Sequence, residues 1–332
     1  MVEGDSHNAE NFSRENWTWQ YEKVSSGEAR IFVCEFEGKI VGYYHVPIYI
    51  GQIDGNLKKF AMVQDVAVSR LMRGQSVFRK IAEFATEDLV NSDINLIYTF
   101  PNDKSIHTFV KYNGYKQISV FDCFVLPIRS ADVLSAKIKL FGLEKIAGWF
   151  ADKFIGLLTK KISPKSKFEK IDFFDEKTVE FFIKFGRRFS VSLNRDAKYL
   201  NWRFFEKPSG KHVVIKMSRD EKISAVVVFK LDEILKTKTA VILDFAFTEK
   251  ENFYELVNYL KKNAENIFGE KIGLIFTAVN CTEIEAKYGF VKVPPKFNPR
   301  PLNLLVKNIT EDEATVFDSK KWHAILSDWD VL

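Results

Sequence analysis

Cysteine is scarce in this chain of 332 residues, which has only Cys34, Cys123 and Cys281. The three lie far apart, form no Cys-x-x-Cys pair and have no metal-ligand spacing with the five histidines. The sequence therefore argues against a disulfide framework and a metal site, and we expect buried free thiols in a reducing compartment.

Long apolar runs and an excess of one charge are missing too. No run approaches the roughly 20 apolar residues of a membrane-spanning helix, and residues 1–10 are too polar and acidic for a signal peptide. The 49 basic and 44 acidic residues leave a net charge of +5, too slight a bias to predict nucleic-acid binding. We expect a cytoplasmic protein without a nucleic-acid partner.

Several catalytic signatures are also absent. The sequence has no Gly-x-x-x-x-Gly-Lys-Ser/Thr loop, no His-Glu-x-x-His and no Gly-x-Ser-x-Gly. What it does have is a hydrophobic content of 46% with 31 Phe, which is typical of a globular protein with well-filled cores. Its length predicts two domains of ordinary size.

The most informative segment is 62–81, where an alternating apolar strand meets an Arg-Gly-Gln turn and then an amphipathic helical pattern. Such a junction leaves backbone N–H groups unpaired at a helix N-terminus, where the helix dipole favours anions. It predicts a cradle for a pyrophosphate. The alternative is an ordinary strand–turn–helix with a surface turn.

The chain also repeats itself, because four segments recur in the same order and at nearly constant separation. The matched pairs are 19–23 (WQYEK) with 202–207 (WRFFEK), 65–68 (DVAV) with 244–247 (DFAF), 96–102 (LIYTFPN) with 274–280 (LIFTAVN), and 111–115 (KYNGY) with 287–290 (KYGF). We infer a duplicated domain.

Both copies predict a helical start, an antiparallel hairpin, a strand–turn–helix and a strand–helix–strand. In the first copy we expect helices at 16–23, 75–90 and 105–112 and strands at 29–37, 39–48, 62–68, 96–100 and 115–127. In the second we expect helices at 175–188, 195–205 and 252–268 and strands at 168–174, 213–231 (a hairpin), 241–247, 272–277 and 290–306. The first copy lacks the opening strand and helix of the second, so either the chain begins late or another segment supplies that strand.

This order, with the motif 73–78 (RGQSVF), resembles the GNAT (Gcn5-related N-acetyltransferase) superfamily, whose acyl-CoA motif reads Arg/Gln-x-x-Gly-x-Gly/Ala after a strand. Ser76 and Phe78 stand where two glycines are usual. The resemblance implies an α+β fold of two tandem GNAT-like domains, each a mostly antiparallel central sheet flanked by helices. We expect a domain with the acyl-CoA motif at 1–130, an amphipathic linker at 131–167 and a degenerate domain at 168–332.

The resemblance implies that the first copy binds acetyl-CoA or another acyl-CoA as cosubstrate. At the equivalent turn, 247–252 has no glycine and two glutamates that would repel a pyrophosphate. Backbone groups of the strand would pair with pantetheine, the turn would hold the pyrophosphate, and the helix from Ser105 would flank the thioester. The implied cofactor-binding residues are Val66, Val68, Arg73, Gly74, Gln75, Ser76, Val77, Phe78, Arg79, Asn102 and Ser105. The alternative for Asn102 is a helix cap or turn residue.

Acyl transfer to an amine needs a base for the amine and a proton for the leaving thiolate. The family's usual tyrosine, four residues before the glycine of Lys-x-Gly-Phe, is Val110 here. We therefore expect His107 or Tyr112 as acid and Asp65 as base. Alternatively His107 simply faces solvent, Asp65 is structural because it recurs as Asp244, and the thiolate, with an ordinary pKa of about 8.5, leaves unaided.

Residues 133–167 carry apolar residues at helical spacing, punctuated by lysines. We expect a linker helix packed between the domains. The alternative is weak contact with an anionic membrane surface.

The sequence thus predicts an acyl-CoA-dependent N-acyltransferase, an acetyltransferase, acting on a small amine. Residues 100–102 (FPN) and the ending at 322–330 resemble a subgroup of bacterial tandem GNAT proteins, some of whose relatives sit among cell-surface polysaccharide genes. That resemblance implies an amino-sugar acceptor. Two alternatives remain: an aminoacyl-tRNA-dependent (Fem-type) transferase, which would have a basic groove and no CoA cradle, and a non-catalytic binding module.

Overall fold

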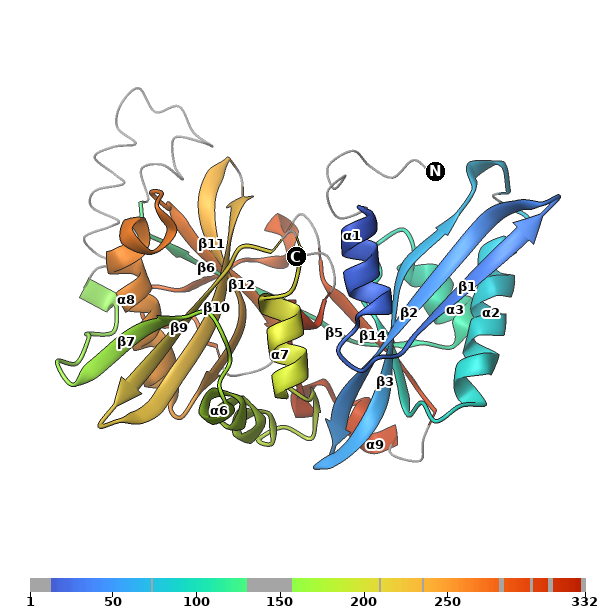
Figure 1. Ribbon diagram of the computed structural model, residues 1–332. Coiled ribbons are helices and arrows are strands. Elements are labelled where there is room, and N and C mark those ends of the chain that lie inside the picture. The colour runs from blue at the N-terminus through green and yellow to red at the C-terminus, as the bar shows by residue number, and fades with distance from the viewer. Residues whose placement is uncertain are drawn as a thin grey trace, which may run out of the picture.

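The computed structural model describes residues 13–72, 74–129, 157–208, 210–234, 236–280, 284–298, 301–309 and 313–329. Its strands join into one long, mostly antiparallel sheet that runs through two halves, with helices packed on its faces (Figure 1). We call residues 13–129 the first half and 157–329 the second half. The architecture confirms the mixed α/β class and the central antiparallel sheets that the sequence predicts.

The elements of the first half follow the predicted order. They are α1 (Arg14–Trp17), η2 (Thr18–Glu22), β1 (Ala29–Phe36), β2 (Lys39–Ile53), β3 (Asn56–Val68), η3 (Arg70–Met72), α2 (Val77–Val90), β4 (Leu96–Thr99), α3 (Ile106–Asn113), β5 (Lys116–Val120) and β6 (Asp122–Pro127). Two differences matter. The strands β2 and β3 are longer than expected and form a hairpin of their own, and the single strand expected at 115–127 is two strands.

The second half begins with β7 (Ser166–Ile171), α6 (Glu176–Gly186), β8 (Val191–Leu193), α7 (Ala197–Phe204), β9 (His212–Arg219), β10 (Lys222–Ile234), β11 (Thr237–Phe247) and α8 (Lys250–Phe268). It ends with β12 (Leu274–Asn280), β13 (Val291–Lys292), η4 (Pro295–Phe297), β14 (Asn303–Asn308), α9 (Glu313–Val316), η5 (Ser319–Lys321), β15 (Trp322–Ile325) and η6 (Leu326–Asp328). The short strands β8 and β15 were not predicted, because three or four residues carry too little pattern.

Local chemistry explains the main helices. In α2 the buried residues Ile81, Ala85 and Leu89 recur every four positions and face the sheet. Asp175 caps α6, its side chain accepting a hydrogen bond from the Thr178 amide at 2.8 Å. The helix α2 packs against β2 and β3, and α6 packs against β10 and β11.

The two halves exchange their last strands. The sheet order is β5-β14-β4-β3-β2-β8-β15-β12-β11-β10-β9-β7, with β1 beside β2 and β6 between β12 and β13. Thus β14, late in the chain, lies between β4 and β5, and β6 lies among the strands of the second half (Figure 1). The expectation that 115–127 and 290–306 each complete their own copy is therefore wrong, because apolar patterning specifies that a strand is buried and not which sheet buries it.

A reciprocal contact relates the two halves. The equivalent rings of Trp19 and Trp202 stack with centroids 4.5 Å apart. The indole N–H of Trp19 donates to the Trp202 carbonyl at 3.0 Å, and that of Trp202 donates to the Trp19 carbonyl at 3.1 Å. Each residue of the pair makes the contact that its counterpart makes, as at a two-fold interface, which supports duplication of one domain.

Both copies contain a parallel strand pair that separates at the same place. In the first half the β3–β4 ladder ends at Val63 and Thr99, where the threonine hydroxyl donates to the Val63 carbonyl at 2.9 Å. In the second half the hydroxyl of Thr277 donates to the Ile242 carbonyl at 3.3 Å at the end of the β11–β12 ladder. The space beyond each threonine differs between the copies.

In the second half, β15 fills that space. On one edge of β12, Val279 pairs with Asp122 of β6. On the other edge it pairs with Ile325 of β15, and earlier residues of β12 pair with β11 on that same edge. The segment β15–η6 therefore lies between the diverging ends of β11 and β12. In the first half, no strand of the described residues occupies the equivalent space beside β3.

The predicted linker helix and its membrane contact fall on 133–167, of which 133–156 lie outside the described residues. Within the part of the chain that the structure describes, no helix has the length and apolar composition needed to cross a membrane. Cys34 and Cys123 are free thiols, and burial raises the pKa of Cys123 to about 11. Cys281 lies outside the described residues.

Candidate active site

A bulge distorts β3 where it separates from β4. The ladder with β2 pairs His45 with Gln64 and Tyr43 with Ala67, so Asp65 and Val66 together face a single residue of β2. Asp65 has φ 45°, in the left-handed region that non-glycine residues rarely adopt. Such bulges re-aim side chains and often lie at functional sites. The bulge faces β2, and it lies in the part of β3 whose opposite edge β4 leaves uncovered.

A hollow of about 210 Å³ opens at this point. It lies between the free edge of β3, the end of β4 and the start of α3, and it is closed by rings from α2 and from the end of the chain. Its lining residues are Met62, Val63, Gln64, Asp65, Val66, Phe78, Thr99, Phe100, Pro101, Asn102, Ser105, Phe109 and Trp329. We call it the strand-gap hollow.

The turn before α2 presents unpaired amides. Gly74 and Ser76 have φ 82° and 59°, and the helix begins at Val77. In the described part of the chain, no side chain caps this helix, and the N–H groups of Ser76, Val77, Phe78 and Arg79 donate no hydrogen bond. Within the described residues, the predicted free amides are therefore present.

A second hollow of about 450 Å³ lies in front of these amides. Its lining residues are Val68, Met72, Gly74, Ser76, Val77, Phe78, Arg79, Thr108 and Tyr112. The Arg79 Nε donates to Glu83 at 2.7 Å on the helix surface, and Gln75 is exposed with its amide bound to the Met72 carbonyl at 3.3 Å. Arg73 lies outside the described residues.

Phe78 belongs to both hollows. Its ring packs edge-on against Phe109 of α3, with centroids 5.5 Å apart, and is half-buried. The bulky residue at a usual glycine position is thus accommodated in the α2–α3 interface. It forms a wall shared by the strand-gap hollow and the hollow at the amides.

Asp65 is a buried carboxylate held by one hydroxyl. The Tyr21 hydroxyl donates to its Oδ2 at 2.5 Å and accepts from Nε2 of Gln64 at 3.2 Å. Burial raises the pKa of Asp65 above its ordinary value, against the lowering effect of the Tyr21 hydrogen bond. Nearby His45 gives no compensating charge, because burial lowers its pKa to about 4. Among the described residues, no lysine or arginine pairs with Asp65.

The equivalent Asp244 is bound quite differently. Its Oδ2 lies 3.1 Å from Nε of Arg195 and accepts a hydrogen bond from the Ser327 hydroxyl at 2.6 Å. Arg195 also pairs with Asp328 at 2.8 Å, and this whole cluster is buried. Asp244 is thus a structural carboxylate, whereas Asp65 faces a hollow without a cation. The recurrence of the residue does not give the two carboxylates one role.

The other predicted catalytic residues lie elsewhere. His107 is exposed on α3 with its ring 6.2 Å from that of Tyr112, and it lines neither hollow. Tyr112 lines the hollow at the amides, with the Arg79 guanidinium 6.0 Å from its ring. The structure therefore does not bring His107 and Tyr112 to Asp65. It gives no support for either as the acid in the strand-gap hollow.

Asn102 acts mainly as a turn residue. Its Oδ1 accepts from the amides of Lys104 and Ser105, each at 3.1 Å, and so stabilises the turn before α3. This agrees with the alternative interpretation, although Asn102 and Ser105 both line the strand-gap hollow.

Sequence reasoning missed Tyr21, Gln64 and Trp329. Tyr21 lies in a repeated segment but 44 positions from Asp65, and nothing in the sequence links the two. Trp329 reaches the strand-gap hollow from η6, with its carbonyl accepting from Nη2 of Arg203 at 2.5 Å. Only the folded topology reveals this neighbour.

Comparison with known proteins relates the first part of the chain to a family. The family described as acetyltransferase (GNAT) domain matches residues 5–117. No curated protein matches the sequence.

Solved structures share the fold over most of the chain. A probable N-acyltransferase from Enterococcus faecalis V583 aligns with TM-score 0.59 at 12% identity over 85% of this chain and 62% of that protein, so this chain spans less than two thirds of its length. A GCN5-related N-acetyltransferase from Anabaena variabilis ATCC 29413 gives 0.59 at 10% identity over 90% and 71%. The N-myristoyltransferase of Saccharomyces cerevisiae with bound myristoyl-CoA gives 0.57 at 12% over 89% and 74%.

Proposed function

Since residues 5–117 match the acetyltransferase (GNAT) domain family, we propose that this chain is an acyl-CoA-dependent N-acyltransferase whose first half binds the acyl-CoA. One observation carries the proposal. The free edge of β3, the strand-gap hollow and the uncapped start of α2 lie next to one another in the first half. Together they offer hydrogen-bonding groups for an amide-containing chain and a positive helix end for a diphosphate.

In this proposal the amides of Ser76, Val77, Phe78 and Arg79 bind the pyrophosphate. The pantetheine pairs with the backbone of Val66 and Val68 as an added strand would. The second half has no such role, because β15 fills its strand gap and Glu249 and Glu251 lie at the start of α8. The free amides and free strand edge favour this function over the aminoacyl-tRNA-dependent alternative.

The acceptor is a small amine or an amino sugar. Its nitrogen attacks the thioester carbonyl carbon, the C–S bond breaks, and the thiolate leaves with the electron pair. Asp65 takes the amine proton, a task suited to a carboxylate whose pKa is raised by burial. The buried Oε1 of Gln64 has no partner among the described residues and is available to a donor N–H. Trp17, which is 37% exposed, lies beside Tyr21 and offers a ring face to a cationic acceptor.

The acyl group is short, and we favour acetyl. The strand-gap hollow has a volume of about 210 Å³ and is bounded by four rings, those of Phe78, Phe100, Phe109 and Trp329. A long acyl chain would have to displace at least one of them. The hollow therefore suits an acetyl group better than the myristoyl group of the yeast structure.

Binding of CoA to a matched pair of variants tests the cradle. Gly74 and Gly55 both have φ 82°, and a Cβ added at either meets no atom within 4 Å. Gly74→Asp places a carboxylate at the pyrophosphate site and should weaken CoA binding, measured by calorimetry, by at least about tenfold, or 1.4 kcal/mol. Gly55→Asp carries the same backbone strain in the β2–β3 turn and should bind normally. Equal affinities for the two variants would contradict the proposed cradle.

A screen of small amines and amino sugars with acetyl-CoA, followed by release of free thiol, then tests the reaction. Acyl-CoA binding without turnover on any amine would favour a non-catalytic binding module.

A further inference from the structure

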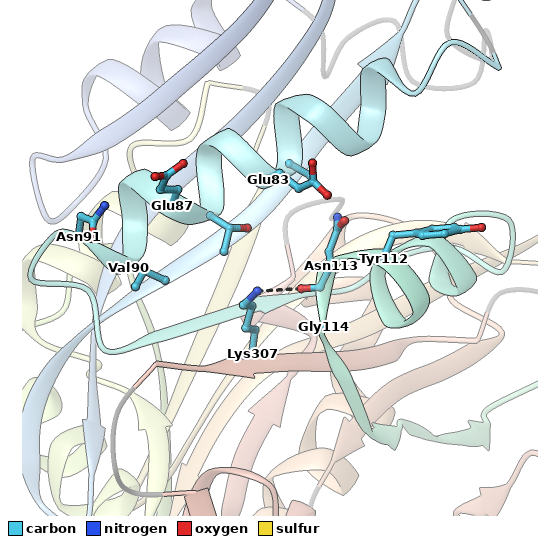
Figure 2. A pocket seen from close by; sticks show the side chains of 10 residues that line it. Glu83, Glu87, Val90, Asn91, Tyr112, Asn113, Gly114 and Lys307 are labelled. Atoms are coloured by element: carbon cyan, nitrogen blue, oxygen red, sulfur yellow. Dashed lines mark hydrogen bonds between the residues drawn. The ribbon is translucent and has the colours of Figure 1, made fainter.

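A third hollow, of about 530 Å³, lies between the C-terminal part of α2, the end of α3 and the exchanged strand β14 (Figure 2). It is separate from the strand-gap hollow, with which it shares no lining residue. Lys307 of β14 and Asn113 of α3 lie at its base, and Glu83 and Glu87 project from α2 (Figure 2). We call it the helix-pair groove.

Asn113 is an unusual residue for a protein interior. Its side chain is 5% exposed, and neither its amide nitrogen nor its amide oxygen has a hydrogen-bond partner among the described residues. Buried amides are nearly always satisfied, because an unpaired polar group in a protein interior is costly. An unsatisfied amide that lines a hollow points to a polar ligand.

Lys307 is a half-buried cation without a counter-ion. Its ammonium donates to the main-chain carbonyl of Asn113 at 2.9 Å, which leaves two N–H donors. In the described ranges, no carboxylate lies within ion-pair distance of it, and burial lowers its pKa. An anionic group beside Lys307 would therefore be favourable.

The rim carries the opposite charge. Glu83 is already bound to Arg79 at 2.7 Å, whereas Glu87 has no side-chain partner among the described residues. A simple anion would be repelled by these glutamates, and a simple cation by Lys307. A ligand with both charges can place its anionic group at Lys307 and its cationic group at the glutamates.

We propose that the helix-pair groove binds a small zwitterion of the amino-acid class. The carboxylate contacts Lys307 and the amide of Asn113, and the ammonium group faces Glu87. The site exists only because β14 crosses from the other half of the chain, and it does not depend on the acyltransferase assignment.

Titration of the full-length protein with the free α-amino acids tests the proposal. Thermal shift identifies the tightest ligand, and calorimetry compares it with its carboxamide, which lacks the carboxylate, and its N-acetyl derivative, which lacks the ammonium. We expect both analogues to bind at least about tenfold more weakly, because each lacks one charged contact, and tenfold corresponds to about 1.4 kcal/mol. Lys307→Met should cause a similar loss, while Lys80→Met, an exposed α2 lysine outside the groove, should not.

Asn113→Leu gives an independent test. Because it removes an unsatisfied buried amide, it should raise the melting temperature of the protein while weakening the binding of the ligand. The proposal is overturned if no amino acid binds at millimolar concentration, or if the analogues bind equally well. It is also overturned if the ligand competes with CoA and Lys307→Met weakens CoA, since the groove would then hold the nucleotide end of CoA.

Discussion

Asp65 and Asp244 occupy equivalent places in the two copies, yet we expect their asparagine variants to change stability in different ways. Arg195 and Asp244 have side chains 1% and 0% exposed and form an ion pair at 3.1 Å. Asp244→Asn leaves the buried guanidinium with Asp328 alone, and breaking a buried pair costs about 3–5 kcal/mol. At roughly 2–4 °C per kcal/mol in large domains, the variant should melt roughly 6–20 °C lower.

Asp65→Asn removes a buried charge that has no cation partner in the described residues, and its amide oxygen still accepts from Tyr21. Its melting temperature at neutral pH should be unchanged or higher. The pKa of Asp65 is raised in the folded state, so its ionisation favours unfolding. Wild-type stability should therefore fall as pH rises from the ordinary aspartate pKa through the raised one, and the variant should lack that fall.

Thermal unfolding of both variants and the wild type, followed by circular dichroism between pH 4 and pH 8, measures these differences. Acetyl-CoA binding by each folded variant checks that the cradle is intact. A large loss of stability in Asp65→Asn, matching that of Asp244→Asn, would refute the reasoning. It would mean that both carboxylates are structural.

Two further predictions concern the strand-gap hollow. Trp329→Ala should shift the preference toward longer acyl chains, because each buried CH₂ adds about 0.8 kcal/mol, or about fourfold in affinity. Competition among acetyl-, butyryl- and octanoyl-CoA measures this preference. An unchanged ranking of the three would contradict the idea that Trp329 closes the strand-gap hollow. Tyr21→Phe removes the hydrogen bond that lowers the pKa of Asp65, so the acidic limb of kcat/KM for the amine acceptor should move to higher pH. A uniform loss of rate at every pH would instead indicate a purely structural tyrosine.

Much of the fold follows from local sequence patterns. The apolar spacing of α2 and the alternation of β1 predict their elements closely, because these patterns depend on neighbours along the chain. The pairing of β6 with β12 and of β14 with β4 does not follow, since either strand offers a buried face to either copy. Which strand pairs with which half depends on contacts across the whole sheet.

The site shows the same division. The turn at Gly74 and a helix beginning at residue 75 were predicted from adjacent residues, and the observed helix begins two residues later, at Val77, without a side-chain cap. Sequence alone did not distinguish Asp65 from Asp244, because the difference comes from Arg195, which lies 49 positions from Asp244. Residues brought together by tertiary structure decide which carboxylate is neutralised.

The crossing of β14 has a consequence for biosynthesis. A nascent chain that has emerged only as far as residue 129 possesses β4 and β5 but not the strand that separates them. Trp329, which helps close the strand-gap hollow, emerges later still. The half that carries the proposed chemistry is therefore complete only after nearly all of the polypeptide has left the ribosome, and a late truncation would remove β14 or Trp329 from it although residues 13–129 were all made correctly.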